Sequence, residues 1–424
     1  MNFKEIRATF FIALWFVILT FPIMVIKVNT VDNTIVWRWH NMLTIGLGTF
    51  FGGILWRFAL HRRRAPGKRP ATVMTAEQQE QQQETMDTGH PLIDRLKAIP
   101  AMIAQPKIKR SLFIALGVFI LIYPFAFSLY QTNIMITALI YVMLALGLNI
   151  VIGLGGMLHL GYIAFFAVGA YTYGILNRFF GLGFWAALPL GAVLAVVAGV
   201  LLAMPVLRLR GDYLAIVTLG FAEIVRIVIN NTAGLTGGPQ GIGSIPRPGF
   251  FGLEMNLQAA TTYTYFILVA VVLLTIFVVW RFENSRLGRA LVAMGEDDIA
   301  AEAMGIDLTR TKVIAFALGS LWAGLGGVIF ASRTTFINPA SFTVWQSVIV
   351  LSCVVLGGMG SIVGSIVGAM GLILIPEYLR AFSEYRMLMF GAILIIMMVF
   401  RPDGLIRKKR KAYTFPVETE EGSQ

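Results

Sequence analysis

Two oppositely charged residues, Glu223 and Arg226, stand three positions apart inside the apolar run 213–229. This spacing places both on one face of a helix, where they can form an ion pair. Charges inside a membrane span are costly, and they normally face the interior of a helix bundle or a water-filled path. The pair therefore predicts either an internal ion pair that locks two helices or a role in a translocation path or gate.

Other residues that could support catalysis or metal binding are sparse. His159 is one of four histidines, with no cysteine or acidic cluster near it in the sequence, so a metal site is not expected. We expect His159 to bond across helices or to line a cavity. The chain has no Gly-Lys-Ser or Gly-Lys-Thr phosphate loop, no hydrolase elbow and no dinucleotide fingerprint. An enzyme is therefore disfavoured, and no cofactor is expected in this chain.

A polar segment, residues 281–312, separates two long apolar runs. Asp297 or Asp298 can cap a short helix within it, and Gly305 is placed to end that helix. The apolar face of this helix consists of Ile299, Ala303 and Met304. A short amphipathic helix held at the membrane surface by two spans is suited to docking into another protein.

The composition predicts an all-α membrane protein. Hydrophobic residues make up 57% of the 424 residues and charged residues 13%, whereas ordinary soluble proteins carry roughly 25% charged residues. The net charge of +12 fits an excess of Lys and Arg on one side of a membrane better than it fits nucleic-acid binding. The single cysteine, Cys353, lies in an apolar run, so no disulfide framework is expected.

The apolar runs near spanning length number about 12, or about 10 if short ones are joined. They are residues 9–26, 42–60, 111–127, 133–152, 157–176, 184–206, 213–229, 263–280, 313–331, 344–356, 362–375 and 387–400. The first is interpreted as a retained span, with a signal peptide as the less favoured alternative. Runs 344–356 and 362–375 are short, and a Gly-rich segment joins them. They can therefore be two tilted spans or one broken span.

Clusters of Lys and Arg recur in the short loops. They include Arg208 and Arg210 before run 213–229, the arginines of 281–312, and a basic stretch after the last run. Twelve spans place all these clusters on one side, the cytoplasm, together with both termini. The chain then divides into an N-terminal pair of spans (1–60), a cytoplasmic linker (61–108), a transmembrane domain (109–405) and a basic, then acidic, tail (406–424).

Glycine-rich segments mark three places in the transmembrane domain. The stretches 147–156 and 324–327 indicate close helix packing or a gate lined by backbone. The third follows run 213–229 and contains Gly237, Gly238, Gln240 and Gly241. Its turn-forming residues predict a shaped loop on the periplasmic side. This loop can contact a soluble partner or cover the exit of a path, and loop geometry alone is an equal alternative.

The stretches RLRGDYLAIVTLGFAEIVRI, NNTAGLTGGPQGI and VVLGGMGSIVGSIVGA, with the ending RPDGL, carry a resemblance that covers essentially the whole chain. The sequence resembles the LivM-type permease subunits of ABC importers for branched-chain amino acids. The resemblance implies a type II-like importer fold of about 10–12 spans in a bacterial inner membrane. It implies a complex with a second homologous permease, two ATP-binding subunits that hold ATP and Mg²⁺, and a periplasmic amino-acid-binding protein.

The resemblance also assigns roles to segments of this chain. The short helix matches the loop that couples to the ATP-binding subunits, through Asp298, Ile299, Glu302, Ala303, Met304 and Gly305. A proline found after this motif in many importers is absent, and Phe316 lies near its position. Substrate is expected at an outer mouth formed by 237–243 and 338–342, and to follow a path of modest polarity rather than a charged trap.

Three other functions stay open from the sequence. A permease of the same superfamily could carry another small solute, such as urea, an amide or a sugar. An ion-coupled secondary transporter would use Glu223 as a proton-linked residue and would work without ATP-binding subunits. A receptor or structural membrane protein is a weaker alternative, since it explains neither the docking helix nor the charge pair.

Overall fold

The computed structural model describes residues 26–29, 34–37, 117–206, 209, 211–249, 256–378, 391, 395, 401 and 404–406. The chain divides into two compact units, Met1–Gln105 and Pro106–Gln424. In the first unit, β1 (Ile26–Asn29) and β2 (Thr34–Trp37) form an antiparallel ribbon between the sequence positions of the first two predicted spans. Those spans, the linker 61–108, Arg208, Arg210 and tail residues 407–424 lie outside the described residues.

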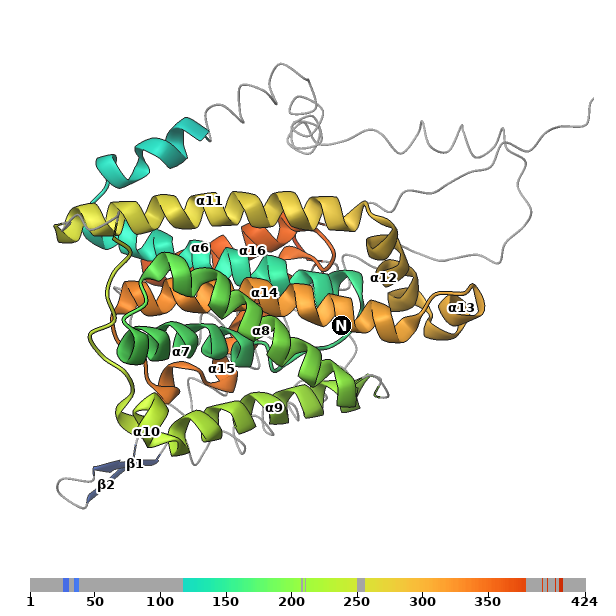
Figure 1. Cartoon of the computed structure of the whole chain (residues 1–424), viewed down its shortest axis with the longest axis horizontal. Helices are drawn as coiled ribbons and strands as arrows, with labels where there is room; N and C mark the ends of the chain where they lie inside the picture. Colours follow the sequence, from blue (N-terminus) through green and yellow to red (C-terminus); the bar gives the residue numbers. More distant parts are fainter. Residues whose placement is uncertain are drawn as a thin grey trace, which may run out of the picture. The chain divides into compact units, whose positions relative to one another are not determined.

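The second unit is a helical bundle, which confirms the all-α prediction for the transmembrane domain (Figure 1). An apolar helix, Gly117–Ala126, precedes it. The described helices are then α6 (Leu129–Asn149), the π-helix η1 (Ile150–Leu154), α7 (Ile163–Phe180), α8 (Phe184–Val206), α9 (Asp212–Asn231), α10 (Ala233–Thr236), the 3-10 turn η2 (Gly238–Gln240), α11 (Leu257–Glu283), α12 (Arg286–Glu296), α13 (Asp298–Ala303), α14 (Leu308–Thr334), the 3-10 turn η3 (Pro339–Ser341), α15 (Val344–Gly357) and α16 (Ile362–Tyr378).

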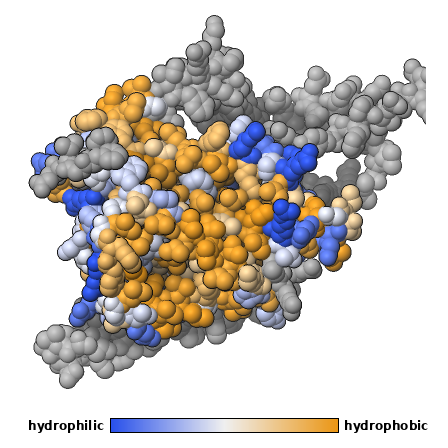
Figure 2. Space-filling model, viewed as in Figure 1, coloured by the Kyte–Doolittle hydropathy of each residue, from blue (hydrophilic) through white to orange (hydrophobic). Residues whose placement is uncertain are grey.

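Five helical segments in the described part of the chain are long and apolar enough to cross a membrane: Leu129–Leu154, Phe184–Val206, Leu257–Glu283, Leu308–Thr334 and Pro339–Gly357. Figure 2 shows a broad apolar band over the middle of the bundle and hydrophilic residues toward both ends. This distribution suits helices that cross a bilayer and present their ends to water. The described chain is therefore a multi-pass membrane protein.

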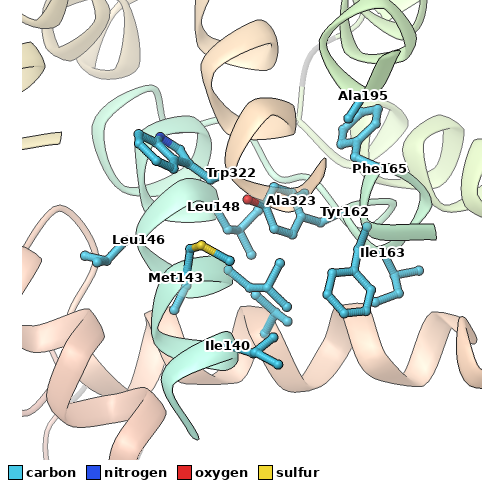
Figure 3. Packing of buried hydrophobic residues seen from close by; sticks show 14 of the residues in the cluster. Ile140, Met143, Leu146, Leu148, Tyr162, Ile163, Phe165, Ala195, Trp322 and Ala323 are labelled. Carbon is cyan, nitrogen blue, oxygen red and sulfur yellow. The ribbon is translucent and has the colours of Figure 1, made fainter. Parts of the chain in front are cut away.

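Helix α14 forms the centre of the bundle and packs on α6, α7 and α8. A Cβ at Gly169 of α7 would overlap the carbonyl oxygen of Gly324, and one at Gly324 would lie 2.5 Å from the methyl group of Ala195 in α8. Figure 3 shows the neighbouring contact, in which Trp322 and Ala323 of α14 pack beside α6 and Tyr162. The glycines of 324–327 therefore allow close helix packing inside one chain, as small residues do in membrane bundles.

The predicted span 157–176 is wrong in its first part. Helix α6 passes into the π-helix η1, and the chain from Gly155 to Gly161 is not α-helical before α7 begins at Ile163. Gly156 has φ +65°, and a Cβ at Gly161 would overlap the carbonyl oxygen of Thr218. This apolar segment is thus an irregular and partly buried connection, which membrane folds tolerate where the backbone lies against protein.

The two short runs near the C-terminal end form two helices, α15 and α16, rather than one broken helix. A four-residue turn joins them, and they pack so closely that a Cβ at Gly368 would overlap the carbonyl oxygen of Cys353. The Asn149 side chain holds the turn, because its Oδ1 accepts the Gly360 N–H at 2.8 Å. The Leu405 N–H reaches the same turn and donates to the carbonyl oxygen of Leu356 at 2.9 Å.

Candidate functional site

The predicted docking helix is present as α13, which begins and ends where its sequence indicates. Asp297 caps it, since its Oδ1 accepts the N–H groups of Ile299 and Ala300 at 2.9 and 3.1 Å. Gly305 follows the helix with φ +82° and donates its N–H to the carbonyl oxygen of Glu302 at 2.9 Å. A left-handed conformation at this position favours glycine, which explains why the helix stops there.

The apolar side chains of α13 point away from the protein. Ile299 is 69% exposed and Met304 83% exposed, and Ala303 is exposed as well. Ala301, which the sequence analysis did not select, is the residue that packs inward, at 4% exposure. Large apolar side chains projecting from the end of a membrane protein are typical of a surface that another protein covers.

Helices α12 and α13 lie at one end of the bundle (Figure 1) and are fixed there by packing and by an ion pair. Leu291 and Met294 of α12 are buried, and Gly295 lies against the backbone of Gly155. Lys312 is buried near the start of α14 and its Nζ lies 3.6 Å from Asp298 Oδ2, which ties α13 to α14. The burial of Lys312 depends on tertiary packing, so no local pattern in the sequence indicates it.

The predicted outer mouth lies at the opposite end of the bundle. Ile242 and Ile337 exchange two backbone hydrogen bonds of 2.9 Å, and a Cβ at Gly241 would lie 3.0 Å from the Cα of Asn338. The segments 237–243 and 338–342 are therefore neighbours, as expected from the sequence. Gly237, Gly238 and Gly241 all have positive φ, so this loop has a defined shape, with Gln240 exposed at its end.

Glu223 and Arg226 form an ion pair within α9. Arg226 Nε donates to both carboxylate oxygens of Glu223 at 3.0 Å, and Nη2 also donates to Oε1. The side chains are 38% and 33% exposed, so the pair does not lock two helices of this chain together. A charge pair left partly exposed on a membrane helix suits water or another subunit better than lipid.

His159 is buried in the irregular connection before α7. The expected hydrogen bond from this residue across helices is not formed. Its ring lies 5.2 Å from Phe316 and 5.5 Å from Phe165, centre to centre. Neither ring nitrogen has a hydrogen-bond partner, so His159 does not bond across helices. The next residue provides the interhelical bond instead, since the Leu160 N–H donates to Thr218 Oγ1 at 3.1 Å.

The described helices form a multi-pass membrane bundle with a short, exposed helix at one end and a shaped loop at the other. The family model for the branched-chain amino acid transport system permease component matches residues 130–398. The chain belongs to this family.

Curated relatives agree with the family. LivM, the high-affinity branched-chain amino acid transport system permease protein of Salmonella typhimurium, is 44% identical over 324 residues, 72% of this chain and 76% of the relative. LivH of Escherichia coli, a permease protein of the same kind of system, is 27% identical over 63% of this chain and 91% of its own length. The autoinducer 2 import permease LsrC of Escherichia coli is 27% identical over 51% of this chain and 62% of its own. No solved structure matches the chain.

Proposed function

We propose that this chain is the transmembrane permease subunit of an ATP-driven importer of leucine, isoleucine and valine. The outward-facing apolar surface of α13 carries the proposal, because it gives a membrane bundle a place to receive force from another protein. The similarity to LivM supports the substrate class, since that relative is named for high-affinity branched-chain amino acid transport. The chain's own role is transport, and ATP hydrolysis belongs to its partners.

The coupling step follows from how α13 is attached. An ATP-binding subunit would hold α13 by Ile299 and Met304, with Glu302, Ala303 and Gly305 at the edge of the contact. The Lys312–Asp298 ion pair and the short turn before Leu308 join α13 to α14. Helix α14 has 27 residues and so extends about 40 Å, which is long enough to cross a bilayer. Closure of the ATP-binding subunits would therefore move α14 as a rod between inward-open and outward-open arrangements.

The proposed complex contains a second homologous permease, two ATP-binding subunits and a periplasmic binding protein. LivM and LivH are both permease proteins, which supports pairing of this chain with a homologue. ATP and Mg²⁺ would bind in the ATP-binding subunits, where the phosphate chemistry takes place. The binding protein would deliver the amino acid at the end formed by 237–243 and 338–342.

The α13 end of the bundle faces the cytoplasm, and the mouth end faces the periplasm. Arg286, Arg289 and Arg310 gather beside α13, and positive side chains favour the cytoplasmic side of a bacterial inner membrane. Residues 404–406 reach the α15–α16 turn at that same end through Leu405, which supports a cytoplasmic C-terminus. The prediction for the N-terminus rests on Lys4 and Arg7 in the sequence.

The substrate test is a competition experiment in cells that lack their own branched-chain uptake systems and express the full set of subunits. Labelled leucine should enter, and unlabelled isoleucine and valine should compete for entry. Urea, amides and sugars, and also autoinducer 2, for which LsrC is named, should leave leucine entry unchanged. Entry of one of those solutes with no entry of leucine would keep the permease but reject the substrate.

A further inference from the structure

A cavity of about 630 Å³ lies at the mouth end of the bundle, between α6, α14, α15 and α16. Its volume is within the roughly 300–1,000 Å³ that small-molecule sites occupy. Its lining includes Tyr130 near the start of α6, Arg333 near the end of α14 and Trp345 near the start of α15. The predicted mouth and coupling segments contain none of these residues.

Arg333 provides the positive charge in this cavity. Its Nη1 donates to Thr137 Oγ1 at 2.7 Å, and its Nη2 donates to the carbonyl oxygen of Asn133 at 2.9 Å. Both acceptors are neutral, and no carboxylate within the described part of the chain pairs with this guanidinium. Arginine has five N–H donors in a planar fork that fits a carboxylate. The guanidinium is thus fixed in position and keeps donors for an anion.

Glu377 provides a negative charge on another wall of the same cavity. The Tyr130 hydroxyl donates to Glu377 Oε1 at 2.6 Å and so holds the carboxylate. Elsewhere in the lining, the Tyr141 hydroxyl donates to Gln346 Oε1. Arg333 and Glu377 line one cavity, and no ion pair joins these two side chains. Opposite charges on the lining of one cavity match a ligand that carries both charges.

The remaining wall is apolar and comes from three helices. Ile134 of α6, Ile349 of α15 and Leu372 of α16 contribute to it. A branched aliphatic side chain placed there would leave water, at about 0.8 kcal/mol of stabilisation for each buried CH₂ group. The cavity therefore combines the three features that an apolar amino acid requires: a cation, an anion and an apolar surface.

We propose that this cavity is a binding site for the amino acid within the permease itself, with Arg333 holding the carboxylate, the ammonium toward Glu377 and the side chain on the apolar wall. The inference rests on the proposed function, which supplies the substrate class. It differs from the expectation of a path without a charged trap. Arg333 lies two residues before Thr335, whose carbonyl oxygen accepts the Ile245 N–H at 3.0 Å, so the cavity lies next to the mouth.

The test measures ligand binding to the assembled transporter in nanodiscs, without the periplasmic binding protein, by saturation-transfer NMR. Leucine is compared with leucinamide, which lacks the carboxylate. In the wild type, leucinamide should bind about tenfold more weakly or worse, since it cannot use the guanidinium fork. Arg333→Met should lower the affinity for leucine by a similar factor. The affinities for leucine and leucinamide should then lie within about twofold of each other.

Controls separate the site from general damage. Arg178→Met removes an arginine at the end of α7, where it lies over the Phe179 ring outside the cavity, and should leave both ligands unchanged. If Arg333→Met does not assemble, Arg333→Lys keeps the charge without the fork and should show an intermediate loss. The wild type is also measured with and without anionic lipid, because a lipid phosphate could occupy the same guanidinium.

The outcomes are distinct. Equal weakening of leucine and leucinamide by Arg333→Met, or no weakening of leucine, would overturn the site. An Arg333→Met variant that loses only its stabilisation by anionic lipid would overturn it too, in favour of a lipid contact. Leucine uptake by the complete transporter with no leucine binding in the nanodiscs would reject the site and leave the proposed function standing. Uptake of a different solute alone would reject the proposed function.

Discussion

Replacing the exposed apolar side chains of α13 with charged ones should detach the ATP-binding subunit without unfolding the permease. The variant is Ile299→Glu combined with Met304→Glu. Both side chains are largely exposed, at 69% and 83%, so each substitution removes little packing within the chain. Full burial of such a side chain is worth about 1.5–3 kcal/mol, so the exposed fractions offer roughly 1–2 kcal/mol each to a docking partner.

The loss on substitution is therefore roughly 2–4 kcal/mol, which corresponds to a decrease in affinity of at least about 30-fold. The assay is the affinity of a purified ATP-binding subunit for the permease pair in nanodiscs, measured together with leucine uptake and thermal unfolding. Leu235→Glu is the matched control, because this leucine is 45% exposed in the short helix α10 at the other end of the bundle. It should leave the affinity for the ATP-binding subunit unchanged.

Gly305 is a less informative target than these two side chains. Its φ of +82° would strain any other L-residue by about 1–2 kcal/mol, so a bulky substitution would change the backbone as well as the surface. If the double variant binds the ATP-binding subunit as tightly as the wild type does, with normal leucine uptake, α13 is not the docking element. Reduced uptake with unchanged affinity would also refute the reasoning, since it would place the effect elsewhere.

Three further predictions concern the cap and the packing of the bundle. Asp297→Ala removes the α13 cap, costs about 1 kcal/mol and should lower ATP-binding-subunit affinity about fivefold, with the thermal unfolding temperature of the bundle unchanged; a lowered unfolding temperature would show that the cap supports the whole fold. Gly324→Val forces a side chain against α8, where a Cβ already lies 2.5 Å from a methyl group, and should destabilise the bundle by about 1–3 kcal/mol in thermal unfolding. Gly220→Val is its control, with no atom within 4 Å of the added Cβ, and equal behaviour of the two variants would contradict the packing argument. Asn149→Ala leaves the buried Gly360 N–H without its acceptor and should cost about 1–3 kcal/mol, seen as faster hydrogen exchange in the α15–α16 turn; unchanged exchange would mean that the bond does not hold this turn.

Local signals explain what the sequence predicts well. The boundaries of α13 depend on a capping aspartate and on a glycine with positive φ, which are properties of neighbouring residues. The direction in which α13 faces depends on α12 and α14 instead. The inward position of Ala301 and the burial of Lys312 follow from that packing, so helical periodicity over six residues could not reveal them.

Hydropathy alone misplaces the segment around His159. Met157, Leu158 and Leu160 are apolar and extend the apparent span, yet the backbone there is irregular and only partly buried. The adjacent pair Gly155–Gly156 was the available signal, and it favours a break as readily as close packing. A hydropathy window records the polarity of side chains and contains no information on φ and ψ.

The cavity near the mouth shows a different limit. Arg333 follows an apolar run directly, and a cation at the end of a span is normally interpreted as a side chain that reaches the membrane surface. Its contacts with Thr137 and Asn133 join residues about two hundred positions apart in the chain. The relation of Arg333 to Glu377 on α16 depends on the same tertiary arrangement, so the sequence offered no spacing that could indicate it.

The central claim is that this permease imports branched-chain amino acids using ATP. The most direct measurement is uptake of labelled leucine by proteoliposomes that contain both permeases, both ATP-binding subunits and the binding protein, with proton and sodium gradients collapsed. We expect uptake that requires ATP and Mg²⁺ on the α13 side and the leucine-loaded binding protein on the mouth side. Uptake driven by an ion gradient without the ATP-binding subunits, and lost on substitution of Glu223, would contradict it.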